Sequence, residues 1–197
     1  MSDQPIDQRF LVIDFETNGF SDPRAKRQDY TLPWQNYPIQ LSVDVVEGGE
    51  AKHAFDTLIR GAVRLGKWVK ENVPVQLEDL EEGIEFEQAV EMLAELIEPG
   101  TTLVAHHIFF DLELTLARTA RRKEYTSPAL DKVLHAPRFC TKNCAYSKAV
   151  FGNRASLDAL CTHFEVPYEV AKAHSASYDT WVLAQCLLEA QRRGVML

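Results

Sequence analysis

Short apolar runs alternate with amphipathic stretches along this 197-residue chain. Three early runs are rich in β-forming residues and predict strands at RFLVIDF (9–15), PIQLSVDVV (38–46) and AKHAFDTLI (51–59). The turn EGGE joins the second and third runs, so these two strands are expected to pair as a hairpin. Two later runs predict a fourth strand at TTLVAHH (101–107) and a fifth at RFCT (138–141).

Helical periodicity marks much of the remaining chain. Residues 84–98 place their apolar side chains on one face, and Pro99-Gly100 ends the pattern. Residues 123–137 contain two prolines and are expected to form a connector. Three further helices are expected at 111–122, 156–164 and 178–193. The order βββαβαβαα predicts one α/β domain spanning the chain, with helices flanking a single mixed sheet.

The net charge of −8 would by itself disfavour a nucleic-acid partner. The acids are unevenly distributed, because nine of them lie in residues 78–98, which contain no base. The rest of the chain, with 21 basic and 20 acidic residues, is close to neutral. Residues 57–70 carry four bases and no acid. A polyanion could therefore approach one side of the protein, although each cluster is also typical of ordinary solvated surface.

The location and the redox state follow from the composition. No apolar run approaches the ~20 residues that a membrane-spanning helix needs, and the first ten residues do not form a secretion signal. A chain of this length folds without disulfides, so its four cysteines are expected to be reduced thiols. We therefore expect a cytoplasmic protein in a reducing compartment, with no membrane partner.

Two acids mark the end of the first predicted strand. Asp14 and Glu16 are two residues apart, so both side chains point to the same face, with about 6.6 Å between them along the strand. At this spacing they can share one divalent cation or bridge two. Taken alone, the pair is more typical of a solvated strand end than of a metal site.

Two further segments carry acids and histidines. Asp111 follows the fourth predicted strand, where it could also serve as a helix cap. His174 and Asp179 are five residues apart, or about 500° of helical turn, so they would not share a helical face. Both can reach one site if His174 lies in a loop and Asp179 in the first helical turn. Ser175 and Ser177 are N-cap residue types that would allow this break.

The three segments together resemble the DEDDh subgroup of the DnaQ-like 3′–5′ exonucleases. The resemblance extends from about residue 9 to residue 193, and its motifs are FLVIDFET, LVAHHIFFDLELT and HSASYDTWVLAQ. The family usually has Asn at the position of His107. Two more departures are WVKENV, which lacks a His-Gly pair, and RFCTKN, which replaces an Asp-Thr pair. These departures concern substrate contacts more than metal chemistry.

The resemblance implies an RNase H-like fold, with a five-stranded mixed sheet whose first three strands are antiparallel. It also implies two divalent cations, Mg²⁺ or Mn²⁺, in a phosphodiester hydrolase. By the same resemblance, Asp14 would bridge both cations. Glu16 and Asp179 would hold the cation that binds the attacking water, and Asp111 would support the other. His174 would be the general base.

The resemblance also places residues at the substrate. Aromatic side chains at Phe20 and Phe110 would stack on the terminal bases, although Phe110 could instead pack in the core. Thr17 and Asn18 would contact the terminal sugar or base, and His107 would also bind the substrate. Phe20 lies in the long segment 18–38, which is expected to be a loop.

The leading hypothesis is a 3′–5′ exonuclease acting on single-stranded ends, with DNA slightly favoured over RNA. The alternatives are an RNA-trimming enzyme, similar to RNase T or oligoribonuclease, and a non-catalytic nucleic-acid-binding module on the same fold. Relatives of this type are often homodimers, which leaves that assembly open. Association with a polymerase is not indicated by the sequence.

Overall fold

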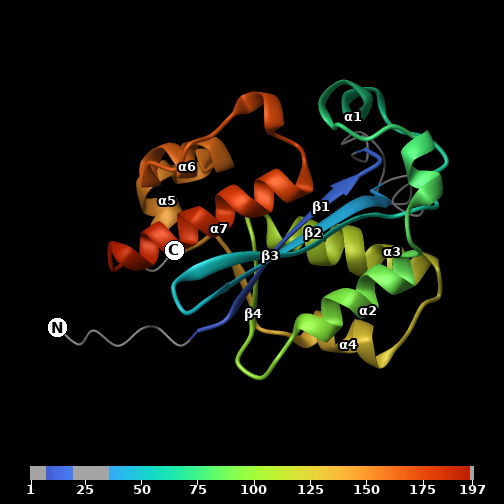
Figure 1. Cartoon of the computed structure of the whole chain (residues 1–197), viewed down its shortest axis with the longest axis horizontal. Helices are drawn as coiled ribbons and strands as arrows, with labels where there is room; N and C mark the ends of the chain where they lie inside the picture. The colour runs from blue at the N-terminus through green and yellow to red at the C-terminus, as the bar shows by residue number, and fades with distance from the viewer. Residues whose placement is uncertain (1–7, 20–35, 196–197) are drawn as a thin grey trace.

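A five-stranded sheet forms the centre of the protein in a computed structural model, which describes residues 8–19 and 36–195 (Figure 1). The spatial order is β3-β2-β1-β4-β5. The strands are β1 (Phe10–Thr17), β2 (Pro38–Glu47), β3 (Glu50–Leu58), β4 (Thr102–Ala105) and β5 (Arg138–Cys140). The first three strands are antiparallel, β4 is parallel to β1, and β5 is parallel to β4. The expected mixed sheet is therefore confirmed.

Helices cover both faces of this sheet. The α-helices of the described ranges are α1 (Lys67–Asn72), α2 (Phe86–Leu96), α3 (Arg118–Arg122), α4 (Pro128–His135), α5 (Ala145–Phe151), α6 (Leu157–Phe164) and α7 (Ala176–Arg192). A π-helix, η3 (Phe110–Ala117), leads into α3, and three short 3₁₀ turns are η2 (Glu78–Glu82), η4 (Gly152–Arg154) and η5 (Val170–Lys172). Within the described residues, no helix is long and apolar enough to span a membrane.

The central strand β1 divides its side chains between two layers. Leu11, Ile13 and Phe15 pack into an apolar cluster that includes residues of α2, η3 and α4. Val12 points to the opposite face and packs against α6 and α7. Figure 1 shows α2 and α7 on opposite sides of the sheet. Because the strand alternates, Asp14 and Glu16 share the face of Val12, which is the face that α7 covers.

The expected connector at 123–137 is wrong in part, because it contains α4. Pro128 occupies the first turn of this helix, where its missing N–H costs nothing, and the Ser127 side chain accepts a hydrogen bond from the Leu130 N–H at 3.0 Å. The prolines indicated a break in structure, whereas one of them begins a helix.

Two other helices had not been expected from the sequence. Helix α1 has six residues and buries only Val69, so it shows no periodic pattern. It nevertheless joins a third apolar cluster with Ile39 of β2 and Leu65, close to the end of the sheet where β1 finishes. Helix α5 begins after Cys144, whose sulfur accepts a hydrogen bond from the Ser147 N–H. Both helices are so short that tertiary packing, rather than local sequence, determines whether they form.

Candidate active site

The first acidic segment lies at the end of the central strand. Asp14 and Glu16 lie opposite Ser42 and Gln40 of β2 in the antiparallel ladder, and the register shifts directly after Glu16. Both side chains are partly buried beneath α7. Strand alternation thus presents two carboxylates on the helix-covered face, at the point where the strand ends.

The second segment brings Asp111 to the same point. Strand β4 runs parallel to β1, and the chain continues from its end into η3, which carries Asp111. The carboxylate is 2% exposed, and its Oδ1 accepts a hydrogen bond from the Phe15 N–H at 3.1 Å. Asp111 therefore contacts the backbone between Asp14 and Glu16. A π-helix at this place fits the tendency of such turns to occur at functional sites.

The third segment is the start of α7. His174 has a left-handed backbone, with φ of 63°, and precedes the N-cap residue Ser175. Asp179 lies in the first turn of the helix, and its Oδ2 accepts a hydrogen bond from the His174 N–H at 3.3 Å. This is the loop-then-helix arrangement that the five-residue spacing requires. Ligand atoms of Glu16, His174 and Asp179 all lie within 4.8 Å of one another.

The four carboxylates perturb one another strongly. Burial raises the pKa of Asp14 and of Glu16 well above the ordinary values, and repulsion from the neighbouring carboxylates raises both further. Burial also raises the pKa of Asp111 to about 7 and that of Asp179 to about 6, although backbone N–H groups oppose both shifts. The cluster is therefore costly when fully ionised and without cations.

Divalent cations fit this donor set. Asp179 Oδ1 is buried without a hydrogen-bond partner among the described residues, although Oδ2 of the same group has one. Carboxylate oxygens are the ligands that Mg²⁺ and Mn²⁺ prefer, and a cation would remove the repulsion that raises the pKa values. His174 adds an imidazole beside the same group of oxygens.

The imidazole of His174 has a neighbour that the sequence analysis did not assign. The indole of Trp68, on α1, meets it edge-on, with ring centroids 4.8 Å apart and planes at 75°. Burial lowers the pKa of His174 below 6.5. The ring is thus neutral at neutral pH and is held on one side by an aromatic wall. Trp68 begins the segment WVKENV, which departs from the family pattern by lacking a His-Gly pair, but nothing local indicates the partner of the indole.

The expected substrate residues fall in different surroundings. His107 and Phe110 stack with ring centroids 6.1 Å apart and planes at 12°, directly before Asp111. Phe110 is partly exposed and belongs to none of the apolar core clusters, so the core alternative is not favoured. Thr17 is buried next to Glu16. Phe20 lies outside the described residues.

Asn18 is buried, and its hydrogen bonds hold neighbouring segments of the backbone together beside the site. Its side-chain oxygen accepts a hydrogen bond from the Tyr37 N–H at 2.9 Å, and its side-chain nitrogen donates to the Arg64 carbonyl at 3.3 Å. Its backbone carbonyl accepts the Gly66 N–H at 2.8 Å. Asn18 therefore ties the end of β1 to the segment that enters α1.

A mixed sheet of this order, with three acidic segments meeting at the end of its central strand, is the arrangement of the RNase H-like fold. The sequence matches the RNase_T exonuclease family over residues 11–187. The chain belongs to this family, which is a family of exonucleases. The resemblance noted from the motifs is thereby confirmed at the level of the exonuclease family.

Similar proteins agree with this assignment. The 3′-5′ exonuclease DinG of Bacillus subtilis is 29% identical over 105 residues, which are 53% of this chain and 10% of DinG. A 3′-exonuclease solved in a study of histone mRNA stem-loop recognition has a TM-score of 0.71 at 13% identity and covers 98% of this chain and 84% of its own. An E. coli ExoI–ssDNA complex has a TM-score of 0.69 at 14% identity and covers 94% of this chain and 41% of its own. The chain spans about a tenth of the length of the curated relatives that it matches.

Proposed function

We propose that this chain is a 3′–5′ exonuclease of the DEDDh subgroup that removes nucleotides from single-stranded 3′ ends, with DNA slightly favoured. The observation that carries the proposal is the meeting of Asp14, Glu16, Asp111 and Asp179 beside His174. The relatives support the polarity, because DinG is named a 3′-5′ exonuclease and the histone mRNA enzyme a 3′-exonuclease. The ExoI complex, with single-stranded DNA, supports the choice of strand.

The carboxylates would hold two divalent cations, Mg²⁺ or Mn²⁺. Asp14, at the centre of the cluster, would bind both, Glu16 and Asp179 would complete one site, and Asp111 would support the other. Bound cations supply charge stabilisation to the entering and leaving oxygens of a phosphodiester. The protein contributes oxygens that are already fixed by β1, η3 and α7, so little reorganisation is needed when substrate arrives.

His174 would act as the general base. Its neutral imidazole would take a proton from water as that water attacks phosphorus, the bond from phosphorus to the 3′ oxygen of the preceding nucleotide would break, and that oxygen would take up a proton from solvent. The products would be a nucleoside 5′-monophosphate and a shortened strand with a 3′ hydroxyl. A neutral ring next to Glu16 and Asp179 is in the right ionisation state to accept that proton.

His107, Phe110 and Thr17 would line the terminal nucleotide. The stacked pair of His107 and Phe110 offers a flat surface beside Asp111, and stacking on such a surface is worth about 1–3 kcal/mol per base. Stacking does not depend on the sugar, so this surface suits DNA and RNA alike.

One assay tests the proposal and its alternatives. Matched single-stranded DNA, single-stranded RNA and duplex, each labelled at the 5′ end, would be incubated with Mg²⁺, Mn²⁺ or EDTA. A ladder that shortens from the 3′ end with either metal and stops in EDTA is the expected result. Faster shortening of RNA would favour the RNA-trimming alternative. Binding without turnover in Mn²⁺ would favour a non-catalytic module and overturn the proposal.

A test variant and its matched control carry the same kind of substitution, Asp to Asn. Asp14→Asn removes a charge from the cluster and is expected to abolish shortening. Asp131→Asn removes a charge from an exposed position of α4 and is expected to leave the rate unchanged. Equal rates for the two variants would refute the assigned site.

A further inference from the structure

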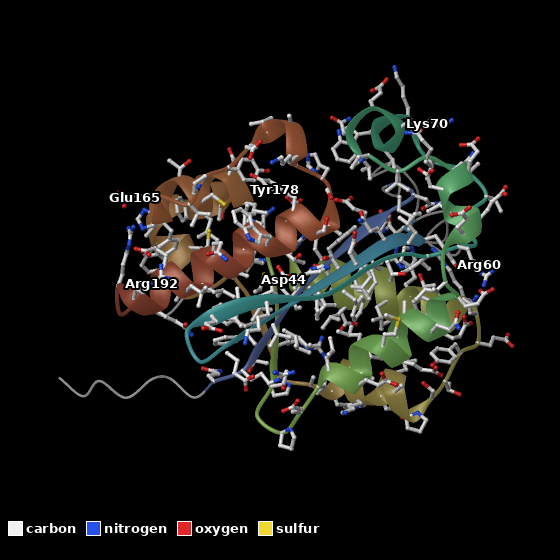
Figure 2. The ribbon with its side chains drawn as sticks, viewed as in Figure 1. Asp44, Arg60, Lys70, Glu165, Tyr178 and Arg192 are labelled. Carbon is white, nitrogen blue, oxygen red and sulfur yellow. The ribbon has the colours of Figure 1, made fainter. Side chains whose placement is uncertain are left out.

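Three buried polar side chains lie on β2 beneath the catalytic helix. Gln40, Ser42 and Asp44 alternate with the apolar Ile39, Leu41 and Val43, and their exposed fractions are 6%, 0% and 2%. Figure 2 labels Asp44 on β2 and Tyr178 on α7, the helix that faces this part of the sheet. A polar row in a buried strand needs partners, because unpaired polar groups in the interior are costly.

Each member of the row has a partner. Ser42 Oγ hydrogen-bonds Thr180 Oγ1 on α7 at 3.1 Å, and Asp44 Oδ1 hydrogen-bonds His53 Nδ1 at 2.8 Å. Gln40 makes the contact closest to the catalytic residues, because its Oε1 accepts a hydrogen bond from the Ala176 N–H at 3.3 Å. Ala176 is the first residue of α7.

The orientation of the Gln40 amide is fixed by a second bond. Its Nε2 donates to both oxygens of Asp56 on β3, at 2.9 and 3.1 Å. An ionised carboxylate only accepts hydrogen bonds, so the nitrogen of Gln40 must face Asp56. The oxygen of Gln40 must then face the helix, where a donor is available.

The first N–H of α7 depends on this oxygen. The N-cap Ser175 makes no side-chain capping bond, and Ala176 is fully buried. The first N–H groups of any helix have no partner within the helix, and a buried one cannot turn to water. Gln40 therefore caps the catalytic helix from a neighbouring strand.

The same glutamine is linked to the other side of the site. Gln40 lies directly opposite Glu16 in the β1/β2 ladder. The hydrogen bond from Ala176 to Gln40 thus connects the Glu16–Gln40 strand pair with the start of α7. Asp179 lies in the first turn of this helix, and His174 lies just before it. Glu16, Asp179 and His174 are the three residues whose ligand atoms lie within 4.8 Å of one another.

We propose that Gln40, oriented by Asp56, is a positioning residue that sets the distance between the Glu16 carboxylate and the His174–Asp179 segment. The inference rests on the proposed function, since it concerns the geometry of that site. The later turns of α7 are held independently of Gln40, because Val182, Leu183, Cys186 and Leu187 pack them into an apolar cluster. Loss of the Gln40 bond should therefore loosen the first turn without unfolding the protein.

The test uses Gln40→Leu, which keeps a side chain of similar size and removes the hydrogen bonds to Ala176 and to Asp56. Amide hydrogen exchange in residues 174–180 is expected to accelerate, while exchange in residues 182–192 stays slow. Activity and Mn²⁺ affinity are each expected to fall about 10- to 100-fold, which is typical when a residue behind metal ligands is lost. The loss should appear in kcat at saturating substrate.

Two further variants separate positioning from a general loss of stability. Gln88→Leu removes an exposed amide-oxygen bond at the start of α2, where Gln88 Oε1 accepts the Glu85 N–H at 3.0 Å, and it should leave kcat unchanged. The double variant Gln40→Glu/Asp56→Asn reverses donor and acceptor between the two side chains, keeps the net charge, and restores an acceptor for Ala176. It should recover most of the lost activity and the slow exchange.

The outcomes are distinguishable from failure of the proposed function. If the unmodified protein hydrolyses no nucleic acid, the exonuclease proposal fails, and the exchange measurement still tests whether Gln40 holds the helix. Unchanged exchange in residues 174–180 of Gln40→Leu, or equal losses of kcat in Gln40→Leu and Gln88→Leu, would overturn the positioning role.

Discussion

The carboxylate of Asp111 accepts the backbone N–H of Phe15 at 3.1 Å, in the interior of the protein. Phe15 lies between Asp14 and Glu16, so this bond fastens the second acidic segment to the backbone of the first. The phenyl ring of Phe15 points into the opposite layer and is buried there. The position of Asp111 is therefore set by backbone and core, and the cluster keeps its shape despite the repulsion among its charges.

Asp111→Asn is expected to lower the hydrolysis rate about 10- to 100-fold in Mg²⁺, because the charge is lost while the amide oxygen can still accept the Phe15 N–H. The fold should be retained, and the melting temperature in EDTA should rise or stay equal, since one repelling charge is gone. Thermal unfolding with and without Mn²⁺ measures this. A variant that keeps its full rate would show that Asp111 does not support a cation.

Stability without metal should fall as the pH rises. The folded pKa values of Asp111 and Asp179, about 7 and about 6, lie above the ordinary value of 3.8. The folded state therefore binds more protons than the unfolded state between about pH 4 and pH 7, so stability is greatest below that range and is lost across it. The melting temperature in EDTA, followed from pH 4.5 to 8, should decline. Saturating Mn²⁺ should remove the decline at high pH, and a flat curve in EDTA would contradict the shifts.

The rate should depend on the ionisation of His174. Burial lowers its pKa below 6.5, so the imidazole is neutral at pH 7, and under the proposed role it would cease to act as a base as the pH falls through that pKa. The expected profile of kcat at saturating metal is flat above neutrality and falls on the acid side.

His174→Gln should reduce kcat about 10²- to 10⁴-fold. It should also abolish the part of the fall in kcat at low pH that is caused by protonation of the imidazole. If kcat of this variant still falls at low pH, and the midpoint of that fall shifts with metal concentration, protonation of the carboxylates is the cause. An identical profile in both proteins would argue against His174 as the base.

Trp68→Ala should loosen the His174 ring. An edge-on aromatic pair is worth about 0.5–1.5 kcal/mol beyond its buried area, so kcat is expected to fall about 2- to 10-fold. The indole is 42% exposed, and its loss should change the melting temperature little. Trp68→Phe keeps an aromatic edge and should retain most of the rate. Steady-state kinetics measure both variants. If kcat falls equally in Trp68→Ala and Trp68→Phe, the contact between the two rings is not the cause of the loss.

The sequence predicts the sheet because its strands are short, apolar and separated by clear turns. It misses α4 because Pro128 interrupts a pattern at the one place in a helix where proline is favourable. The acidic positions are visible as local spacings, and the structure brings their side chains together. The contacts of Trp68 with His174 and of Gln40 with Ala176 join residues more than 100 positions apart, so no local pattern indicates them.

The acidic face of α2 has a consequence for how a strand reaches the enzyme. Glu91 and Glu95 are exposed on this helix, on the side of the sheet away from α7 (Figure 1). Under the proposed function, these two negative charges would repel a nucleic acid that approaches over the exposed face of α2. This local repulsion would weaken as added salt shortens the range of the field, so substrate could then approach over α2 as readily as over a neutral surface.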